Sequence, residues 1–153
     1  MLLLIQFLCF VAYITFIVKR YGVLPSISDS WYHLPLNMKF LFTLFTWSIG
    51  VPMLLYGTTW FFMSGAGLCF VGAAPMFKMK QVLTDEVHFG GATLGIFGAL
   101  LGIGFAFSSW FPLAVFILMS LLIILRKVPN YLWWIEIVAF VTILAGLIPS
   151  QLS

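Results

Sequence analysis

Long apolar segments alternate along this chain with short polar connections. Six such segments cover residues of about 1–18, 39–56, 60–77, 89–107, 110–125 and 131–149. A helix needs about 20 apolar residues to cross the hydrocarbon core of a bilayer. The apolar residues run continuously and do not alternate with polar ones, which is typical of spanning helices and not of barrel strands. The pattern predicts an all-α, polytopic integral membrane protein, a bundle of six transmembrane helices.

Composition agrees with this prediction. Of the 153 residues, 63% are hydrophobic and 7% charged, whereas about a quarter of the residues of a soluble domain are charged. Six spans leave short connections, so we expect one transmembrane domain over residues 1–153. The seven Lys and Arg are too few for a basic surface that binds nucleic acid. Cys9 and Cys69 lie in apolar segments, where a thiol packs as a small hydrophobic group.

The basic residues lie in alternate connections. Every Lys and Arg follows the first, third or fifth apolar segment, namely Lys19, Arg20, Lys39, Lys78, Lys80, Arg126 and Lys127. The other two connections and the C-terminal tail carry none. Because cytoplasmic loops of membrane proteins are enriched in Lys and Arg, we expect the three basic loops to be cytoplasmic and both termini to lie outside.

The fourth apolar segment carries small residues at regular steps. Its Gly91, Gly95, Gly98 and Gly102 follow one another at three- and four-residue intervals. Such a face allows another helix to approach closely. Two alternatives are open: packing within the chain against the small residues 64–67 of the third segment, or formation of a homo-oligomer or a ligand-facing groove through the glycine face.

The longest polar connection follows the first segment. Between Pro25 and Pro35 it carries Ser26, Ser28, Asp29, Ser30, Tyr32 and His33. The two prolines predict a turn or one helical turn, with Ser28 or Ser30 as a possible N-cap. This connection has enough residues to shape a site. The alternative is a capped turn whose aromatic side chains lie at the membrane surface.

The third connection ends in acidic residues and a histidine. Thr84 is expected to cap the fourth helix, and the helix dipole then favours Asp85 and Glu86 in its first turn. His88 has no such structural explanation, and it lies on the same helix face as Asp85, three residues earlier.

Two polar residues fall inside apolar segments. Glu136 follows the apolar residues 131–135, and a carboxylate there should be paired, protonated or directed into a wet cavity. It can instead extend to the headgroups, and Arg126, Lys127 or a histidine are the candidate partners. Gln6, in the first segment, is expected either to extend to the interface or to form a hydrogen bond between helices.

The predicted topology places all four acidic residues and both histidines at one membrane face. The candidate ligand-binding residues are Ser28, Asp29, His33, Asp85, His88 and Glu136, and Lys39, Lys78 and Lys80 are candidate headgroup contacts. Two histidines with carboxylates can bind zinc, whose bound water hydrolyses esters or amides; they can also relay protons. Because the spacing matches no compact metal-binding motif, we assign no metal ligand.

Two short motifs resemble a known group of membrane proteins. The stretch 25–30, Pro-Ser-Ile-Ser-Asp-Ser, resembles the signature of the damage-regulated autophagy modulators, which belong with the GPI-anchor lipid-remodelling factor to a broad group of small six-helix proteins. Residues 72–75 and 87–92 are similar to the end of the third span and the start of the fourth in that group and in related uncharacterised prokaryotic membrane proteins. The resemblance implies a six-helix bundle with Ser28, Asp29 and His88 lining one polar site near the bilayer surface.

The chain departs from these families in two respects. The first loop of the eukaryotic members is lumenal or extracellular, whereas the cations here predict a cytoplasmic loop. The more distant ceramidase and adiponectin-receptor-like hydrolases complete their zinc site with a second pair of histidines, which this chain lacks. The resemblance therefore carries over no enzymatic activity.

Three functions follow from these observations. The first is a small membrane protein that binds or regulates lipid without catalysis, its polar cluster engaging an anionic headgroup. The second is an oligomeric ion channel, pore or small transporter that uses the glycine face, with His88 or Glu136 as a gating or proton-coupled group. The third is a metal-dependent membrane lipid hydrolase. The sequence names no substrate and no cofactor.

Overall fold

The computed structural model describes residues 2–73 and 81–148, with the side chains of 81–85 outside this description. These residues form helices and connections, and no strand occurs among them. The elements are α1 (Leu2–Tyr21), α2 (Ser30–His33), the 3-10 turn η1 (Leu36–Met38), α3 (Phe40–Leu54), α4 (Thr59–Ala73), α5 (Gln81–Phe107), α6 (Phe111–Leu125) and α7 (Tyr131–Gly146). The prediction of an all-α protein is confirmed, and each predicted apolar segment is occupied by a helix of at least 15 residues.

The helices differ in length. Within the described residues, two are long and apolar enough to cross a membrane, namely α1 and the part of α5 from Glu86 to Phe107. The helices α3, α4 and α6 have 15 residues each and α7 has 16. At 1.5 Å per residue a helix of this size measures about 23 Å, less than the hydrocarbon thickness of about 30 Å. The ends predicted for the third and sixth segments, 77 and 149, lie outside the described residues.

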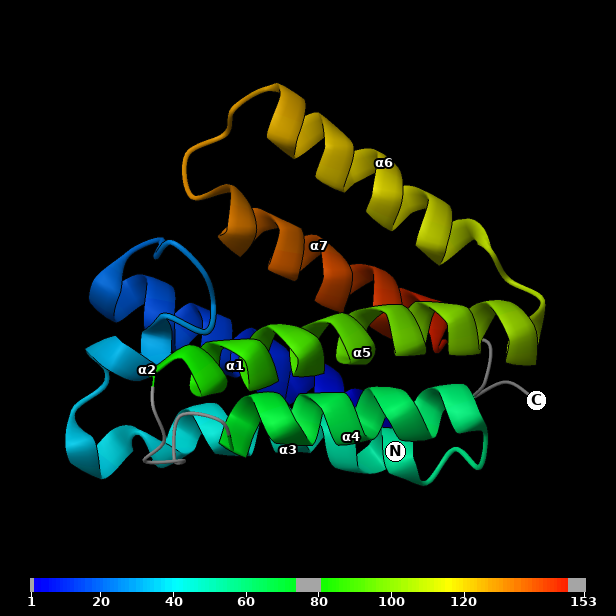
Figure 1. Ribbon diagram of the computed structural model, residues 1–153, viewed down its shortest axis with the longest axis horizontal. Coiled ribbons are helices and arrows are strands. Elements are labelled where there is room, and N and C mark those ends of the chain that lie inside the picture. Colours follow the sequence, from blue (N-terminus) through cyan, green and yellow to red (C-terminus); the bar gives the residue numbers. More distant parts are fainter. Residues whose placement is uncertain (1, 74–80, 149–153) are drawn as a thin grey trace.

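The chain reverses direction at its connections, so its loops gather at two ends. Figure 1 shows α3 and α4 on one side, the hairpin of α6 and α7 on the other, and α5 between them. The end of α1, the start of α5 and the connection from α6 to α7 lie at the same end, which we call the polar end. The described charged side chains all belong to segments at this end: Lys19, Arg20, Asp29, Lys39, Glu86, Arg126, Lys127 and Glu136.

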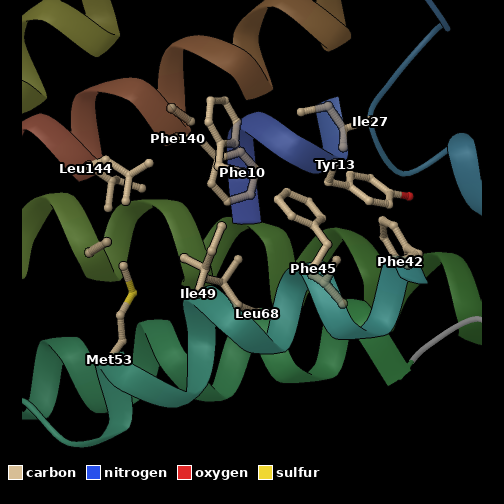
Figure 2. Close-up of a cluster of buried hydrophobic side chains, with 14 of the residues drawn as sticks. Phe10, Tyr13, Ile27, Phe42, Phe45, Ile49, Met53, Leu68, Phe140 and Leu144 are labelled. Atoms are coloured by element: carbon tan, nitrogen blue, oxygen red, sulfur yellow. The ribbon is translucent and has the colours of Figure 1, made fainter. Parts of the chain in front are cut away.

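An aromatic cluster joins α1, α3 and α7 (Figure 2). The ring of Tyr13 stacks on that of Phe45, with centroids 4.5 Å apart and planes at 4°. Phe140 of α7 lies 5.5 Å from Phe10 and 5.4 Å from Phe45, measured between ring centroids. The apolar residues of three helices thereby bury one another, and their van der Waals contacts stabilise the fold.

Gln6 lies inside this helix interface. Its side chain is fully buried, and its Nε2 donates a hydrogen bond to the backbone oxygen of Ile49 in α3, 3.0 Å away. The interhelical alternative for Gln6 is therefore confirmed. Both cysteines, Cys9 and Cys69, are free thiols.

The glycine face of α5 packs against α4. A Cβ atom added at Gly91 would lie 2.9 Å from the backbone oxygen of Gly67, and one at Gly98 would lie 3.0 Å from the backbone nitrogen of Ser64. The hydroxyl of Ser64 donates to the backbone oxygen of Gly95, 2.6 Å away. Small residues allow this close approach. The alternative of packing within the chain is confirmed, and α4 covers the face through which a homo-oligomer was considered.

Two predicted helix starts are wrong. α5 begins at Gln81, so Thr84 lies inside the helix and not at its cap. The cap position of α2 is Asp29, which makes no capping hydrogen bond through its side chain, and neither Ser28 nor Ser30 occupies it. Both serine hydroxyls form hydrogen bonds with other partners, and these tertiary contacts take precedence over the local preference of serine for a cap.

Replacement of Gly91 by Ala should lower the free energy of unfolding by about 1–3 kcal/mol, because the new methyl group overpacks the backbone of α4. Gly90→Ala is the matched control, since a Cβ there meets nothing within 4 Å and alanine favours a helix over glycine. Thermal unfolding in detergent, followed by circular dichroism, measures both variants. Equal melting temperatures would contradict the described packing of α4 on α5.

Candidate functional site

The connection between α1 and α2, residues 22–29, lies against the start of α7; we call it loop 1. The backbone N–H of Trp133 donates to the oxygen of Pro25, 3.1 Å away, and Nδ2 of Asn130 donates to the oxygen of Val23 at 3.0 Å. The first amides of a helix have no partner within the helix. Loop 1 therefore supplies an acceptor to an amide that α7 leaves unsatisfied.

The carboxylate of Glu136 completes this contact. One of its oxygens accepts a hydrogen bond from the backbone N–H of Ile27, and the other lies 3.5 Å from the donating hydroxyl of Ser28. Of the side chains considered from the sequence, Arg126, Lys127 or a histidine, none is the partner in these hydrogen bonds. Two donors of loop 1 therefore bind one side chain of α7, which joins the loop to that helix.

Further hydrogen bonds shape loop 1 itself. The hydroxyl oxygens of Ser26 and Ser28 lie 3.0 Å apart, and Ser26 accepts the backbone N–H of Asp29 at 3.1 Å. The buried hydroxyl of Ser30 lies 2.6 Å from that of Tyr13 in α1. The loop is thus fixed to α1 at one end and to α7 at the other.

A pocket with a volume of about 390 Å³ opens beside loop 1; we call it the amphipathic pocket. Its polar lining consists of Ser26, Ser28, Asp29, Tyr32, His88, Thr93 and Glu136. Its apolar lining consists of Pro25, Phe89, Ala92, Ile96, Phe97, Phe116, Leu132 and Ile135. A smaller cavity of about 30 Å³, also lined by Glu136, extends to the aromatic core at Phe45 and Phe140. Apart from Thr93, the polar groups lie at the end formed by loop 1.

The structure brings four of the six predicted binding residues to this pocket. Ser28, Asp29, His88 and Glu136 all line it, although they come from three separate parts of the chain. His33 does not line it: the side chain is exposed, and its Nδ1 lies 3.0 Å from the backbone oxygen of Asp29. The side chain of Asp85 lies outside the described residues.

The predicted headgroup lysines are placed differently. The Nζ of Lys39 lies 3.5 Å from the ring centroid of Trp31, a cation–π contact away from the pocket lining. Lys78 and Lys80 lie outside the described residues. The lining, as far as the structure describes it, contains carboxylates, hydroxyls and an imidazole but no lysine or arginine.

The described part of the chain contains no set of side chains that could bind a metal ion. Among those residues, no group of three or more His, Cys, Asp or Glu side chains lies close enough together to hold a metal ion. A catalytic zinc site commonly uses three protein ligands and a water molecule. The hydrolase alternative therefore gains no support from this arrangement.

Sequence reasoning missed the apolar walls of the pocket and part of its mouth. Ser26 and Tyr32 belong to the polar stretch singled out in the sequence. Nothing in the sequence indicated that these two residues, and not His33, would line the pocket. Ala92 lies one helical turn after His88, so a small residue on the face of the histidine was the available signal for open space.

The chain matches no protein-family model, no curated protein and no solved structure.

Removal of the Glu136 carboxylate should release loop 1. In Glu136→Ala, the amide of Ile27 loses its side-chain acceptor, a hydrogen bond worth about 0.5–1.5 kcal/mol, so its hydrogen exchange should accelerate about two- to tenfold. Glu86→Ala is the control, since Glu86 is exposed. Exchange of residues 22–29, measured by mass spectrometry, should change only in the first variant. Equal exchange in both would rule out the contact.

Proposed function

We propose that this chain is a multi-pass membrane protein of six spans that binds a lipid in the amphipathic pocket without catalysing a reaction. Apolar side chains that are exposed on the surface of the helices support a location in the membrane. In α6 the buried residues are Pro112 and Phe116, whereas Leu118, Leu121 and Leu125 are at least 50% exposed. Large exposed apolar surfaces are rare on soluble monomers. Helices shorter than the bilayer core are accommodated by thinning of the bilayer or by flanking residues that reach the interface.

The proposed orientation places the polar end at the cytoplasmic face. The described Lys and Arg residues all belong to segments at this end, and the positive-inside rule assigns such segments to the cytoplasm. Both termini then lie on the outer side, and residues 1–153 form one transmembrane domain. In this orientation loop 1 lies at the level of lipid headgroups.

The observation that carries the lipid proposal is the division of the pocket into a polar mouth and apolar walls. Ser28, Asp29 and Glu136 lie where loop 1 meets α7, and Ile96 and Phe97 continue the lining along α5. A lipid has the same division between headgroup and acyl chain. The volume of about 390 Å³ falls in the range of about 300–1,000 Å³ that is usual for small-molecule sites.

The chemistry of the mouth favours a headgroup that donates hydrogen bonds. Asp29 and Glu136 are acceptors when ionised, and the hydroxyls of Ser26 and Ser28 both donate and accept. A hydroxyl or ammonium group suits this set better than the anionic headgroup considered from the lysines. Lipid binding also agrees with the resemblance of loop 1 to the group of the GPI-anchor lipid-remodelling factor. We do not propose an oligomeric channel, because α4 covers the glycine face on which it depended.

A bulky side chain in the pocket should displace the lipid. Ala92→Phe fills the wall of the pocket, whereas Ala106→Phe adds the same group to an exposed position of α5 away from the lining. We expect lipid to copurify with the wild-type chain and with Ala106→Phe in mild detergent, and to be lost from Ala92→Phe. Mass spectrometry of the extracted lipids measures this. Equal lipid content in the two variants would refute binding in the pocket.

A further inference from the structure

The amphipathic pocket ends at a pair of aromatic rings. Phe97 of α5 and Phe116 of α6 meet edge to face, with ring centroids 5.8 Å apart and planes at 84°. Both rings line the pocket, and Phe116 is 6% exposed. Edge-to-face pairs of this kind are favourable beyond the area they bury. The pair therefore forms a floor between the two helices.

The helices converge beyond this floor. A Cβ atom added at Gly146 of α7 would lie 2.8 Å from Ile103 of α5 and 2.9 Å from Pro112 of α6, so the three helices approach closely there. Toward the polar end, α6 moves away from α5, as Figure 1 shows. We call the part of the amphipathic pocket between its polar mouth and the Phe97–Phe116 pair the wedge; along α5 its lining reaches no further than Phe97.

The depth of the wedge follows from helix geometry. His88, at the polar mouth, and Phe97, at the floor, are nine residues apart on α5, which corresponds to about 13 Å along the helix axis. An extended chain of single bonds gains about 1.2 Å per bond, as the reach of an extended backbone shows. About eleven carbon atoms therefore span the distance from mouth to floor.

We propose that the Phe97–Phe116 pair limits the length of the acyl chain, so that the pocket selects a lipid chain of about eleven carbons over the longer chains of the surrounding bilayer. This inference rests on the proposed lipid-binding function and specifies its ligand class. Each methylene that fits beneath the mouth contacts the apolar walls of the pocket, and these contacts raise affinity. A methylene beyond the floor has no such site, because Phe116 is packed in the core and the helices converge behind it.

Chain-length dependence tests this inference. Saturated monoacylglycerols of increasing length serve as probes, since their hydroxyls can donate to Asp29 and Glu136. Binding to the full chain in detergent is measured by native mass spectrometry. For the wild type, affinity should rise with chain length, reach its maximum near the estimated length, and then level off or fall.

Two variants move the floor in opposite directions. The ring of Phe97, which is 43% exposed, forms part of the floor. Because Phe97→Ala removes this ring, the chain length of maximum affinity should increase. Thr93→Phe places a ring one turn closer to the mouth, so the maximum should shift to shorter chains. Phe62→Ala, on an exposed site of α4 outside the lining, is the control and should leave the profile unchanged. Thr93 is also exposed, so this variant does not disturb the core.

The outcomes separate the two proposals. If no probe binds the wild type, or if Ala92→Phe binds the probes as well as the wild type does, lipid binding in the pocket is wrong. If Ala92→Phe abolishes binding but the maximum stays at one length in Phe97→Ala and Thr93→Phe, lipid binding holds and the length limit is wrong. Shifts in opposite directions support the length limit.

Discussion

The segregation of charge to one end of the helices is the constraint on which the rest of this structure depends. Along most of their length the helices have no charged side chain, and the described charges lie in loop 1, in the other polar-end connections or in the adjoining turns. A charge in the middle of a bilayer is costly, so an all-apolar length of helix suits a spanning segment. The consequence is that the described acidic and basic side chains are available for a site only at the polar end.

Glu136 gives the residues at the polar end a defined arrangement. Its carboxylate binds the backbone of Ile27 and the hydroxyl of Ser28, which fixes loop 1 on α7. Asp29, the residue after Ser28, then lines the same pocket as His88 of α5. One hydrogen-bonded carboxylate thus serves the structure and the site together, because the contact that satisfies it also positions the mouth of the pocket.

The sequence predicted the helices well because each apolar segment is long and bounded by polar residues. It placed the starts of α2 and α5 wrongly; at α2, the hydroxyls of Ser28 and Ser30 form other hydrogen bonds in place of a cap. The cost of burying Glu136 was evident from its apolar neighbours. Its partner, the backbone N–H of Ile27, was not evident, because every residue type except proline carries such a group.

The site was predictable only in part for related reasons. Asp29, Ser28 and His88 stood out as polar residues at a common membrane face. His33 stood out equally, yet it comes four residues after Asp29, at the end of α2, and its side chain is exposed. The pocket itself is lined by residues from loop 1, α2, α5, α6 and α7, and their placement depends on tertiary packing and not on any local pattern.

Cysteine labelling tests the central claim most directly. With both native cysteines replaced, single cysteines at Ser26, Lys127 and Gly57 would be exposed to a maleimide that cannot cross membranes, first on intact cells and then on permeabilised ones. The account predicts that Ser26→Cys and Lys127→Cys react only after permeabilisation and that Gly57→Cys reacts on intact cells. Labelling of Ser26→Cys and Gly57→Cys from the same side would contradict a charged end at one face of the membrane.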